Sequence, residues 1–258
     1  MKLQILSDLH LETEVFDPRP IPGAELLVLA GDIDTTWAGL RRFAGWPVPV
    51  LMVAGNHEFD GRDLLRAWKP LRQACTQAGI QLLQHEEALF TDARGRRVRF
   101  LGATRWSDFD LFGEQARPKA QKAAGYYLQK MGATVDGRAL DPELLRRQGH
   151  ACRAWLERAL SWAPSPQADA TVVITHFAPS VRSADPRYGR QPGTASFCNA
   201  DDDLIPRADL WIHGHLHCRH DYRIDRPGRH PARVVCQARG LAKKGEARGF
   251  DPDLLFEV

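Results

Sequence analysis

Short apolar runs rich in β-branched residues recur along this chain, and polar side chains follow several of them directly. The runs are KLQIL (2–6), LLVLA (26–30), VPVLMVA (48–54), VRFLG (98–102), TVVIT (171–175), DLWIH (209–213), RVVC (233–236) and LLFEV (254–258). Nearly continuous apolarity without strict alternation is typical of strands that are covered on both faces. Because open α/β sheets place their sites at the carboxyl ends of strands, the residues after each run are the candidates for function.

Helical patterns separate these runs. Leu64, Trp68, Leu71 and Cys75 recur at helical spacing, although Pro70 is expected to kink or delay that helix. Another helix is expected to begin at Asp141-Pro142 and to end before Pro164. The alternation predicts an α/β layered fold that forms a single domain over residues 1–258. Residues 105–168 contain few strand signals and are expected to form a mostly helical insertion, closed by APSPQADA (163–170).

Composition narrows the possible functions. A formal net charge of +3 is far below the basic footprint of a dedicated nucleic-acid-binding protein. MKLQIL is followed too quickly by polar residues to be a signal peptide, and no apolar run approaches the length of a membrane span. The five cysteines include no CxxC pair and are expected to be reduced. The sequence therefore predicts a cytoplasmic protein that binds neither membrane nor long nucleic acid.

Oxygen and nitrogen ligands follow five of the runs. They are Asp8 and His10 after the first, Asp32 after the second, Asn56 and His57 after the third, His176 after the run at 171–175, and His215 and His217 after the run at 209–213. A single DxH or GD is often a cap or a turn, but ligands at five strand ends predict a metal site. With His57 set aside, seven groups suit two ions, and Asp32 is the expected bridging carboxylate.

The ligand types also indicate which metals fit. Imidazole and oxygen ligands without a thiolate favour Mn, Fe, Zn, Co or Ni over soft metals, and the histidines argue against Mg or Ca. Two such divalent ions, with manganese or iron favoured, are expected to convert a shared water into hydroxide and to clamp an anionic phosphoryl group. Gly214 is expected to let the backbone turn tightly beneath His215 and His217.

The motifs D-L-H, G-D, G-N-H-E, a histidine after a strand, and G-H-L-H occur in this order over residues 8–217. This series resembles the signature of the calcineurin-like metallophosphoesterases. The resemblance implies a four-layer α/β/β/α sandwich of two mixed β-sheets flanked by helices. It assigns Asp8, His10, Asp32 and His217 to one metal, and Asp32, Asn56, His176 and His215 to the other. By the same resemblance His57 is not a ligand: it faces the phosphate or protonates the leaving oxygen, and Asp32 or Glu58 tunes it.

The resemblance is greatest to the bacterial branch that is typified by cyclic-nucleotide and broad-specificity phosphodiesterases. It implies a small phosphate-ester substrate, such as a nucleotide, with His57, Asp32 and Asn56 as catalytic residues. The segment GDIDTTW lacks the arginine-glycine pair of the family's protein phosphatases. A phosphomonoesterase, a nuclease and an inactive scaffold that binds proteins remain the alternatives to a diesterase.

Substrate contacts outside the motifs are less sharply defined. The loops around 105–130 and 180–200 are expected to form the pocket wall. His150, in the insertion, is a candidate contact for substrate phosphate, against the plainer interpretation of a solvent-facing side chain. Trp106, Phe109, Tyr126 and Tyr127 either stack on a base or form core. Arginines between 182 and 190 follow His176 and either contact an anionic substrate or belong to a solvated loop.

Overall fold

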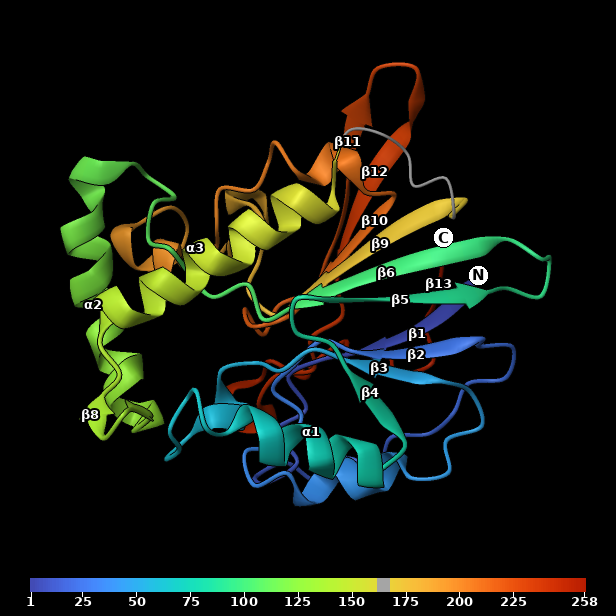
Figure 1. Ribbon diagram of the computed structural model, residues 1–258, viewed down its shortest axis with the longest axis horizontal. Coiled ribbons are helices and arrows are strands. Elements are labelled where there is room, and N and C mark those ends of the chain that lie inside the picture. Colours follow the sequence, from blue (N-terminus) through green and yellow to red (C-terminus); the bar gives the residue numbers. More distant parts are fainter. Residues whose placement is uncertain (162–167) are drawn as a thin grey trace.

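Two mixed β-sheets pack against each other in the computed structural model, which describes residues 1–161 and 168–258 (Figure 1). The first sheet has the order β13-β1-β2-β3-β4, with β1 Lys2–Leu6, β2 Leu26–Leu29, β3 Val50–Met52, β4 Ile80–Leu82 and β13 Leu255–Glu257. The second has the order β11-β12-β10-β9-β6-β5, with β5 Glu86–Thr91, β6 Arg97–Ala103, β9 Ala170–Thr175, β10 Leu210–His213, β11 His220–Arg226 and β12 Arg229–Cys236. The inner strands of both sheets are parallel, and antiparallel partners lie at the edges.

Helices cover the outer faces of the two sheets. Between the sheets, Ile5 and Val28 share a buried apolar cluster with Phe100 and Ile174. Helix α1, Trp68–Gln77, packs on the outer face of the first sheet, and helix α3, Pro142–Ala159, packs on the outer face of the second. The expected four-layer sandwich of two mixed sheets and flanking helices is therefore confirmed.

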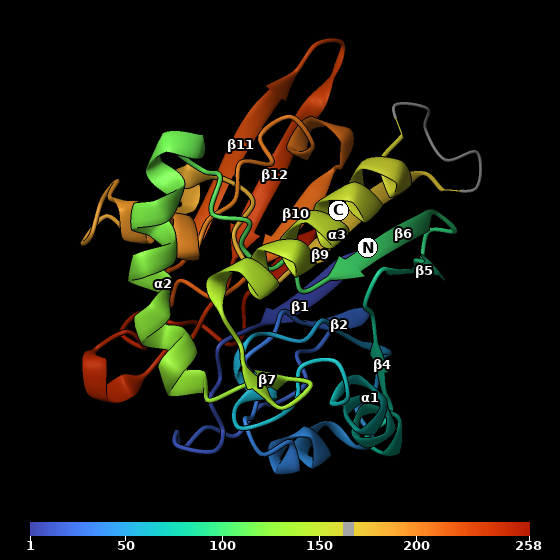
Figure 2. The ribbon, with the colours of Figure 1, turned by 60° about the vertical axis from the view of Figure 1, so that its left-hand side comes forward.

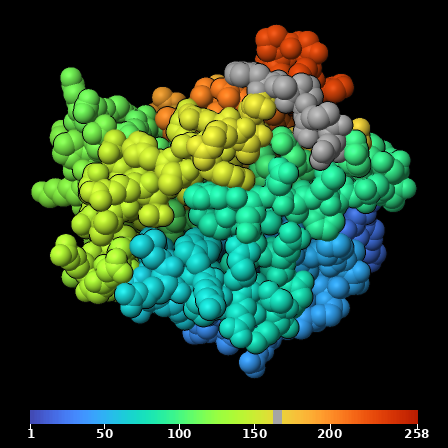
Figure 3. All heavy atoms as spheres, in the orientation of Figure 1, coloured from blue at the N-terminus to red at the C-terminus, as the bar shows by residue number. Residues whose placement is uncertain are grey.

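The insertion is mostly helical in its described part, as expected. It contains α2, Arg117–Met131, then a small hairpin of β7, Thr134–Val135, and β8, Arg138–Ala139, and finally α3. Asp141 caps α3, because its side chain accepts a hydrogen bond of 2.8 Å from the Leu144 N–H. The expected closing stretch at 163–170 falls largely outside the described residues. Figure 2 shows α2 beside the sheets rather than on their faces. In Figure 3 the yellow-green atoms of the insertion form the left-hand part of the surface.

Two edge strands were not anticipated from the sequence. The side chains of β5 and β11 alternate between exposed and more buried positions, so neither strand has the continuous apolarity of the inner strands. The short strand β4 follows α1 directly and was also missed. Pro70 lies in the first turn of α1, so it delays the start of the helix instead of kinking it. Among the described residues, none of the helices has the length and apolarity that spanning a bilayer requires.

Candidate metal centre

The loops after β1, β2, β3, β9 and β10 meet at one edge of the sandwich and carry the ligands that the sequence predicts. Backbone hydrogen bonds join these loops: the Asp8 N–H donates to the carbonyl oxygen of Gly31, and the Gly214 N–H donates to that of His176. Within each sheet, these bonds hold neighbouring ligand loops together, and the His215 N–H joins the two sheets by donating to the Asp8 carboxylate.

The ligand atoms form two groups that share one carboxylate. Asp8, His10, Asp32 and His217 each offer an atom within 4.8 Å of the others, and Asp32, His176 and His215 do the same. Asn56 extends the second group, because its Oδ1 lies 3.2 Å from His176 Nε2. All seven predicted ligands therefore lie together, and Asp32 has the position required of a bridge.

Five of these residues hold an unusual backbone conformation. They are Asp8 (φ 53°), His10 (φ 46°), Asp32 (φ 54°), His215 (φ 73°) and His217 (φ 51°). This left-handed region is costly for residues with a Cβ and persists only where the surroundings enforce it. The fold thus uses backbone strain to aim these side chains at one point.

Close approach to the carboxylates explains two motif glycines. A Cβ on Gly55 would collide with the Asp32 carboxylate, and one on Gly214 would lie 2.6 Å from Asp8 Oδ2. The His215 N–H, just beyond Gly214, donates to both Asp8 carboxylate oxygens at 3.0 and 3.1 Å. Gly214 is therefore required for space beside Asp8, and its carbonyl oxygen also closes a tight turn by accepting from the Leu216 N–H at 3.0 Å.

Acceptors behind three of the histidines fix the direction of their rings. Nδ1 of His217 lies 2.6 Å from Glu246 Oε2, Nδ1 of His10 lies 3.3 Å from Glu12 Oε1, and Nδ1 of His176 lies 2.8 Å from the Ala30 carbonyl oxygen. With Nδ1 as the donor, each ring turns its Nε2 lone pair towards the centre. Glu12 stands two positions after His10 and could have been suspected, whereas no local signal pointed to Glu246.

The residues fit bound cations. With their Nδ1 atoms donating, His10 and His217 bring two Nε2 lone pairs to 3.0 Å from each other, which is favourable only around a positive charge. Asp32 Oδ2 and His215 Nε2 are buried without a hydrogen-bond partner. Burial would lower the pKa of His176, but Asp32 and Asp8 raise it to about 9. Two divalent ions would satisfy all of these atoms.

Orientation by Glu246 leads to a testable expectation. Glu246→Ala should weaken metal binding by about 10–100-fold, because the His217 ring loses the acceptor that aims it. Glu246→Gln keeps an acceptor oxygen and should therefore lose less metal affinity than Glu246→Ala. Titration of metal-free protein with Mn²⁺ measures this directly, with Glu87→Gln on the exposed edge strand β5 as the control. Unchanged affinity in Glu246→Ala would show that His217 needs no support.

His57 lies outside both ligand groups and lines the adjoining cavity. Its backbone N–H donates to Asp32 Oδ1 at 2.8 Å, and its ring Nδ1 lies 2.7 Å from Asp60 Oδ2. Burial lowers the pKa of His57, but Asp32 and Asp60 outweigh it and raise the pKa to about 10. Asp60, which the sequence reasoning missed, is therefore the hydrogen-bonding partner of the ring, and Asp32 acts on it through charge.

Glu58 raises the pKa of His57 through its charge, as expected, and it also has a structural role. Its buried carboxylate accepts hydrogen bonds from the backbone N–H groups of Asp32, Ile33 and Gly55 at 3.0, 2.7 and 2.6 Å. It therefore fastens the loop after β2 to the loop after β3. The sequence identified an acidic residue in the motif but could not show that it points away from the cavity.

Two further histidines lie apart from the centre. His150 Nε2, on α3, is 3.6 Å from Asp110 Oδ2, its side chain is 45% exposed, and it is not among the residues that line the cavity. His213 is buried between the Ser183 hydroxyl and the Gly214 carbonyl oxygen, at 2.9 and 3.0 Å. Neither histidine offers an atom to the ligand groups found among the described residues.

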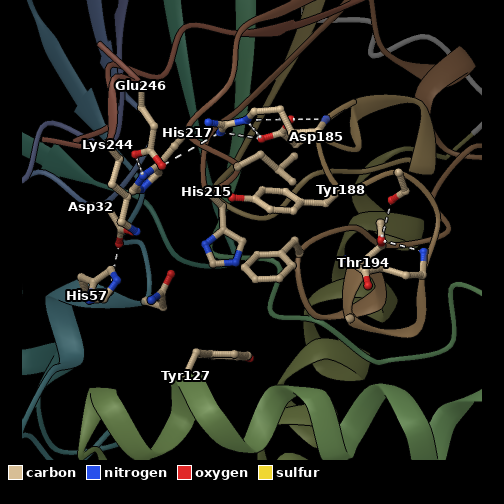
Figure 4. Close-up of a pocket in the computed structure, with 17 residues that line it drawn as sticks. Asp32, His57, Tyr127, Asp185, Tyr188, Thr194, His215, His217, Lys244 and Glu246 are labelled. Atoms are coloured by element: carbon tan, nitrogen blue, oxygen red, sulfur yellow. Dashed lines mark hydrogen bonds and ion pairs between the residues drawn. The ribbon is translucent and has the colours of Figure 1, made fainter. Parts of the chain in front are cut away.

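A cavity of about 370 Å³ opens beside the ligands (Figure 4). Asp32, His57, His215 and His217 lie along one side of it, and Tyr127 of α2 lies across from them. Most of the remaining wall comes from the segment between Asp185 and Phe197, and Lys244 and Glu246 complete it. The two loop regions that were expected to build the wall therefore both contribute to it.

A family comparison agrees with this geometry. The model of the family described as calcineurin-like phosphoesterase matches residues 1–219. The chain belongs to this family. As a calcineurin-like phosphoesterase it is a metal-dependent hydrolase of phosphate esters, which is consistent with the two ligand groups that share Asp32.

A solved structure shares the fold of this phosphoesterase. The crystal structure of phosphopantetheinyl hydrolase from Mycobacterium tuberculosis is similar with a TM-score of 0.70 and 18% identity, covering 96% of this chain and 92% of that one. A dimetal phosphatase from Danio rerio is similar with a TM-score of 0.46 and 14% identity, covering 91% and 86%. A search of proteins with curated functions gives no match to the sequence.

Proposed function

We propose that this phosphoesterase is a cytoplasmic phosphodiesterase that works with two divalent transition-metal ions, with manganese or iron favoured. Asp8, His10, Asp32 and His217 would hold one ion, and Asp32, Asn56, His176 and His215 the other. The supporting observation is the pair of ligand groups joined through Asp32, next to a cavity that His57 lines. When bound, the ions would acidify a water molecule and neutralise charge on the phosphoryl group.

The protein's own groups supply the remaining functions. Asp60 holds the His57 ring and favours its protonated form, so the ring can donate a proton to the oxygen of the departing ester group. Asn56 turns its Oδ1 towards His176, which leaves its amide hydrogens free to bind a phosphoryl oxygen. Asp60 therefore positions His57, and Asn56 and His57 contact the substrate.

Charge in the cavity favours a diester over a monoester. Arg187 lines the cavity, but its Nε and one Nη donate to Asp185 Oδ2 at 2.9 and 2.6 Å. Its charge is therefore largely compensated. Lys244 is the further lining cation, and it is exposed. A diester carries one negative charge and a monoester up to two, so few spare cations are consistent with a diester.

The metal-supplemented enzyme should therefore hydrolyse bis(p-nitrophenyl) phosphate faster than p-nitrophenyl phosphate. We expect kcat/KM for the diester to be higher by at least about tenfold, or about 1.4 kcal/mol of transition-state binding. The measurement is a steady-state assay with Mn²⁺ in excess. The opposite ranking would make the enzyme a phosphomonoesterase, and metal-loaded protein without any hydrolysis would favour the binding scaffold.

A wider panel would locate the natural substrate. It contains 2′,3′- and 3′,5′-cyclic nucleotides, short oligonucleotides and a phosphopantetheinyl ester, the last because the structurally similar hydrolase from Mycobacterium tuberculosis bears that name. Cleavage of oligonucleotides alone, with strong dependence on salt, would indicate a nuclease. His150→Ala belongs to the same assay, and we expect it to leave kcat/KM unchanged, since its side chain is exposed and outside the cavity.

A further inference from the structure

The cavity has an aromatic wall that metal binding does not explain. Tyr127, Tyr188 and Phe197 line it, and they come from two segments far apart in the sequence. Tyr127 belongs to α2 in the insertion, and the other two belong to the segment between β9 and β10. Figure 4 shows Tyr127 across the cavity from His57 and His215, with Tyr188 on the side opposite to Asp32.

These rings form a surface that starts at a predicted metal ligand. The ring centroid of Phe197 lies 5.0 Å from that of His215 and 6.2 Å from that of Tyr127. On its other side the His215 ring packs on Phe177, with 4.1 Å between centroids. A phosphoryl group beside His215 would therefore carry its organic substituent onto aromatic faces.

Two features of this wall are unfavourable in the free protein. Tyr188 is 65% exposed, although its aromatic ring is among the side chains that gain most from burial. The hydroxyl oxygen of Tyr127 is buried but has no hydrogen-bond partner among the described residues. A buried polar atom without a partner destabilises the protein unless a bound group supplies one. Both features would be relieved by a ligand in the cavity.

The other aromatic residues of the insertion serve as a contrast. Trp106 and Phe109 are each 1% exposed and belong to the apolar core, so they are not available to a substrate. Tyr126 is 67% exposed beside Tyr127, but it does not line the cavity. Its ring instead lies against the Lys130 ammonium, 4.7 Å from the centroid. Only part of the aromatic content is thus directed at the site.

We propose that Tyr127, Tyr188 and Phe197 form a subsite for a planar aromatic group on the substrate, either a nucleobase or a simple aryl ring. The proposal rests on phosphoester hydrolysis at the adjoining centre, as set out above. Aromatic side chains stack on any flat π-system with little dependence on its polar pattern. The subsite therefore selects the ester group by shape and aromaticity.

Binding of product-like anions to the Mn²⁺-loaded enzyme tests this without requiring turnover. Calorimetry compares phenylphosphonate with propylphosphonate, and uridine 5′-monophosphate with ribose 5-phosphate. Each aromatic ligand should bind about tenfold more tightly than its partner, as expected for stacking on one or two rings. Tighter binding of uridine 5′-monophosphate than of ribose 5-phosphate identifies a nucleobase subsite. Tighter binding of phenylphosphonate than of propylphosphonate, without a difference between the other two ligands, identifies an aryl subsite.

Variants connect that preference to the named residues. Tyr188→Leu changes an exposed residue and should fold normally, and Tyr127→Leu changes the opposite wall. In both, the aromatic preference should fall to about threefold or less. Tyr126→Leu, on the same helix but outside the cavity, should keep the full preference.

The phosphoester site and the aromatic subsite are refuted by different outcomes. If none of the four anions binds to metal-loaded enzyme, the phosphoester site itself is wrong. If all four bind but the alkyl and aromatic members are equal, or if Tyr188→Leu and Tyr127→Leu retain the preference of the unaltered enzyme, the phosphoester site stands and the aromatic subsite is refuted. Tighter binding of propylphosphonate would refute it equally.

Discussion

His57→Ala should lower kcat by about 10²–10⁴-fold while the bound metal stays at its original level. The reason is positional: His57 belongs to neither ligand group, yet it lines the cavity with its ring fixed by Asp60. Removal of the ring deletes a proton donor and leaves the ligands in place. Elemental analysis of the purified variant and turnover of an alkyl diester, a poor leaving group, measure the two effects separately.

The choice of leaving group decides whether this test is informative. A p-nitrophenolate departs without protonation, so a near-normal rate on an activated aryl ester would say little about His57. Asp60→Asn is the matched variant, because it keeps the His57 ring as proton donor and weakens only the contact that holds that ring. Its loss of kcat should be smaller than that of His57→Ala. Full turnover of the alkyl diester by His57→Ala would mean that another group protonates the leaving oxygen.

Arg105→Met should lower the free energy of unfolding by about 3–5 kcal/mol, the cost of leaving buried charge uncompensated. The Arg105 guanidinium is fully buried and contacts Asp201 and Asp108 at 2.8 Å each. It also donates to the carbonyl oxygens of Trp106 and Gly149 at 2.9 and 3.1 Å. Without it, two carboxylates would remain in a site where burial penalises their charge. Urea denaturation monitored by tryptophan fluorescence gives the value.

Arg153→Met supplies the comparison for Arg105. Its guanidinium also contacts Asp201 at 2.8 Å, but its side chain is 24% exposed and water can replace part of the interaction. A loss nearer 1 kcal/mol is expected there, roughly the range of solvent-accessible pairs. Equal stability of Arg105→Met and the unaltered protein would mean that the acidic side chains rearrange to reach water.

The ion pair between Arg105 and Asp108 makes the free energy of unfolding depend on pH. Burial would raise the pKa of Asp108, but Arg105 holds it below its ordinary value. The carboxylate therefore contributes stability above the pKa of an unfolded aspartate, and that contribution is lost as the pH falls through the lower, folded value. In Arg105→Met this acid-dependent contribution should shrink, which the same denaturation series extended from about pH 7 to about pH 2 would show.

Sequence reasoning succeeded where chemistry is local and failed where it is long-range. The inner strands can be recognised by their continuous apolarity. The predicted ligands follow these strands directly, so the edge of the sandwich on which the ligands meet could be inferred. Glu246 reaches His217 across 29 positions of the chain, and no spacing rule relates the two. The structural role of Glu58 was missed because a motif gives the residue type but not the direction in which its side chain points.

Edge strands show the same limit for the fold. β11 pairs on one side only and alternates exposed with more buried side chains. It therefore lacks the continuous run of buried residues by which β10 is recognised. Likewise, the carboxylate of Asp201 accepts hydrogen bonds from Arg105, which lies 96 positions away in the chain. Such contacts arise from the packing of separate segments, which one sequence does not encode in a readable pattern.

The placement of the insertion has a consequence for how such an enzyme can diversify. β6 and β9 are parallel neighbours with an unbroken register from Val98↔Ala170 to Ala103↔Thr175, and the insertion is the crossover between them. Its length can therefore change without shifting either strand. Since α2 carries Tyr127 to the cavity while all seven predicted ligands lie outside the insertion, new substrates can be acquired by exchanging one crossover segment, with the hydrolytic machinery inherited intact.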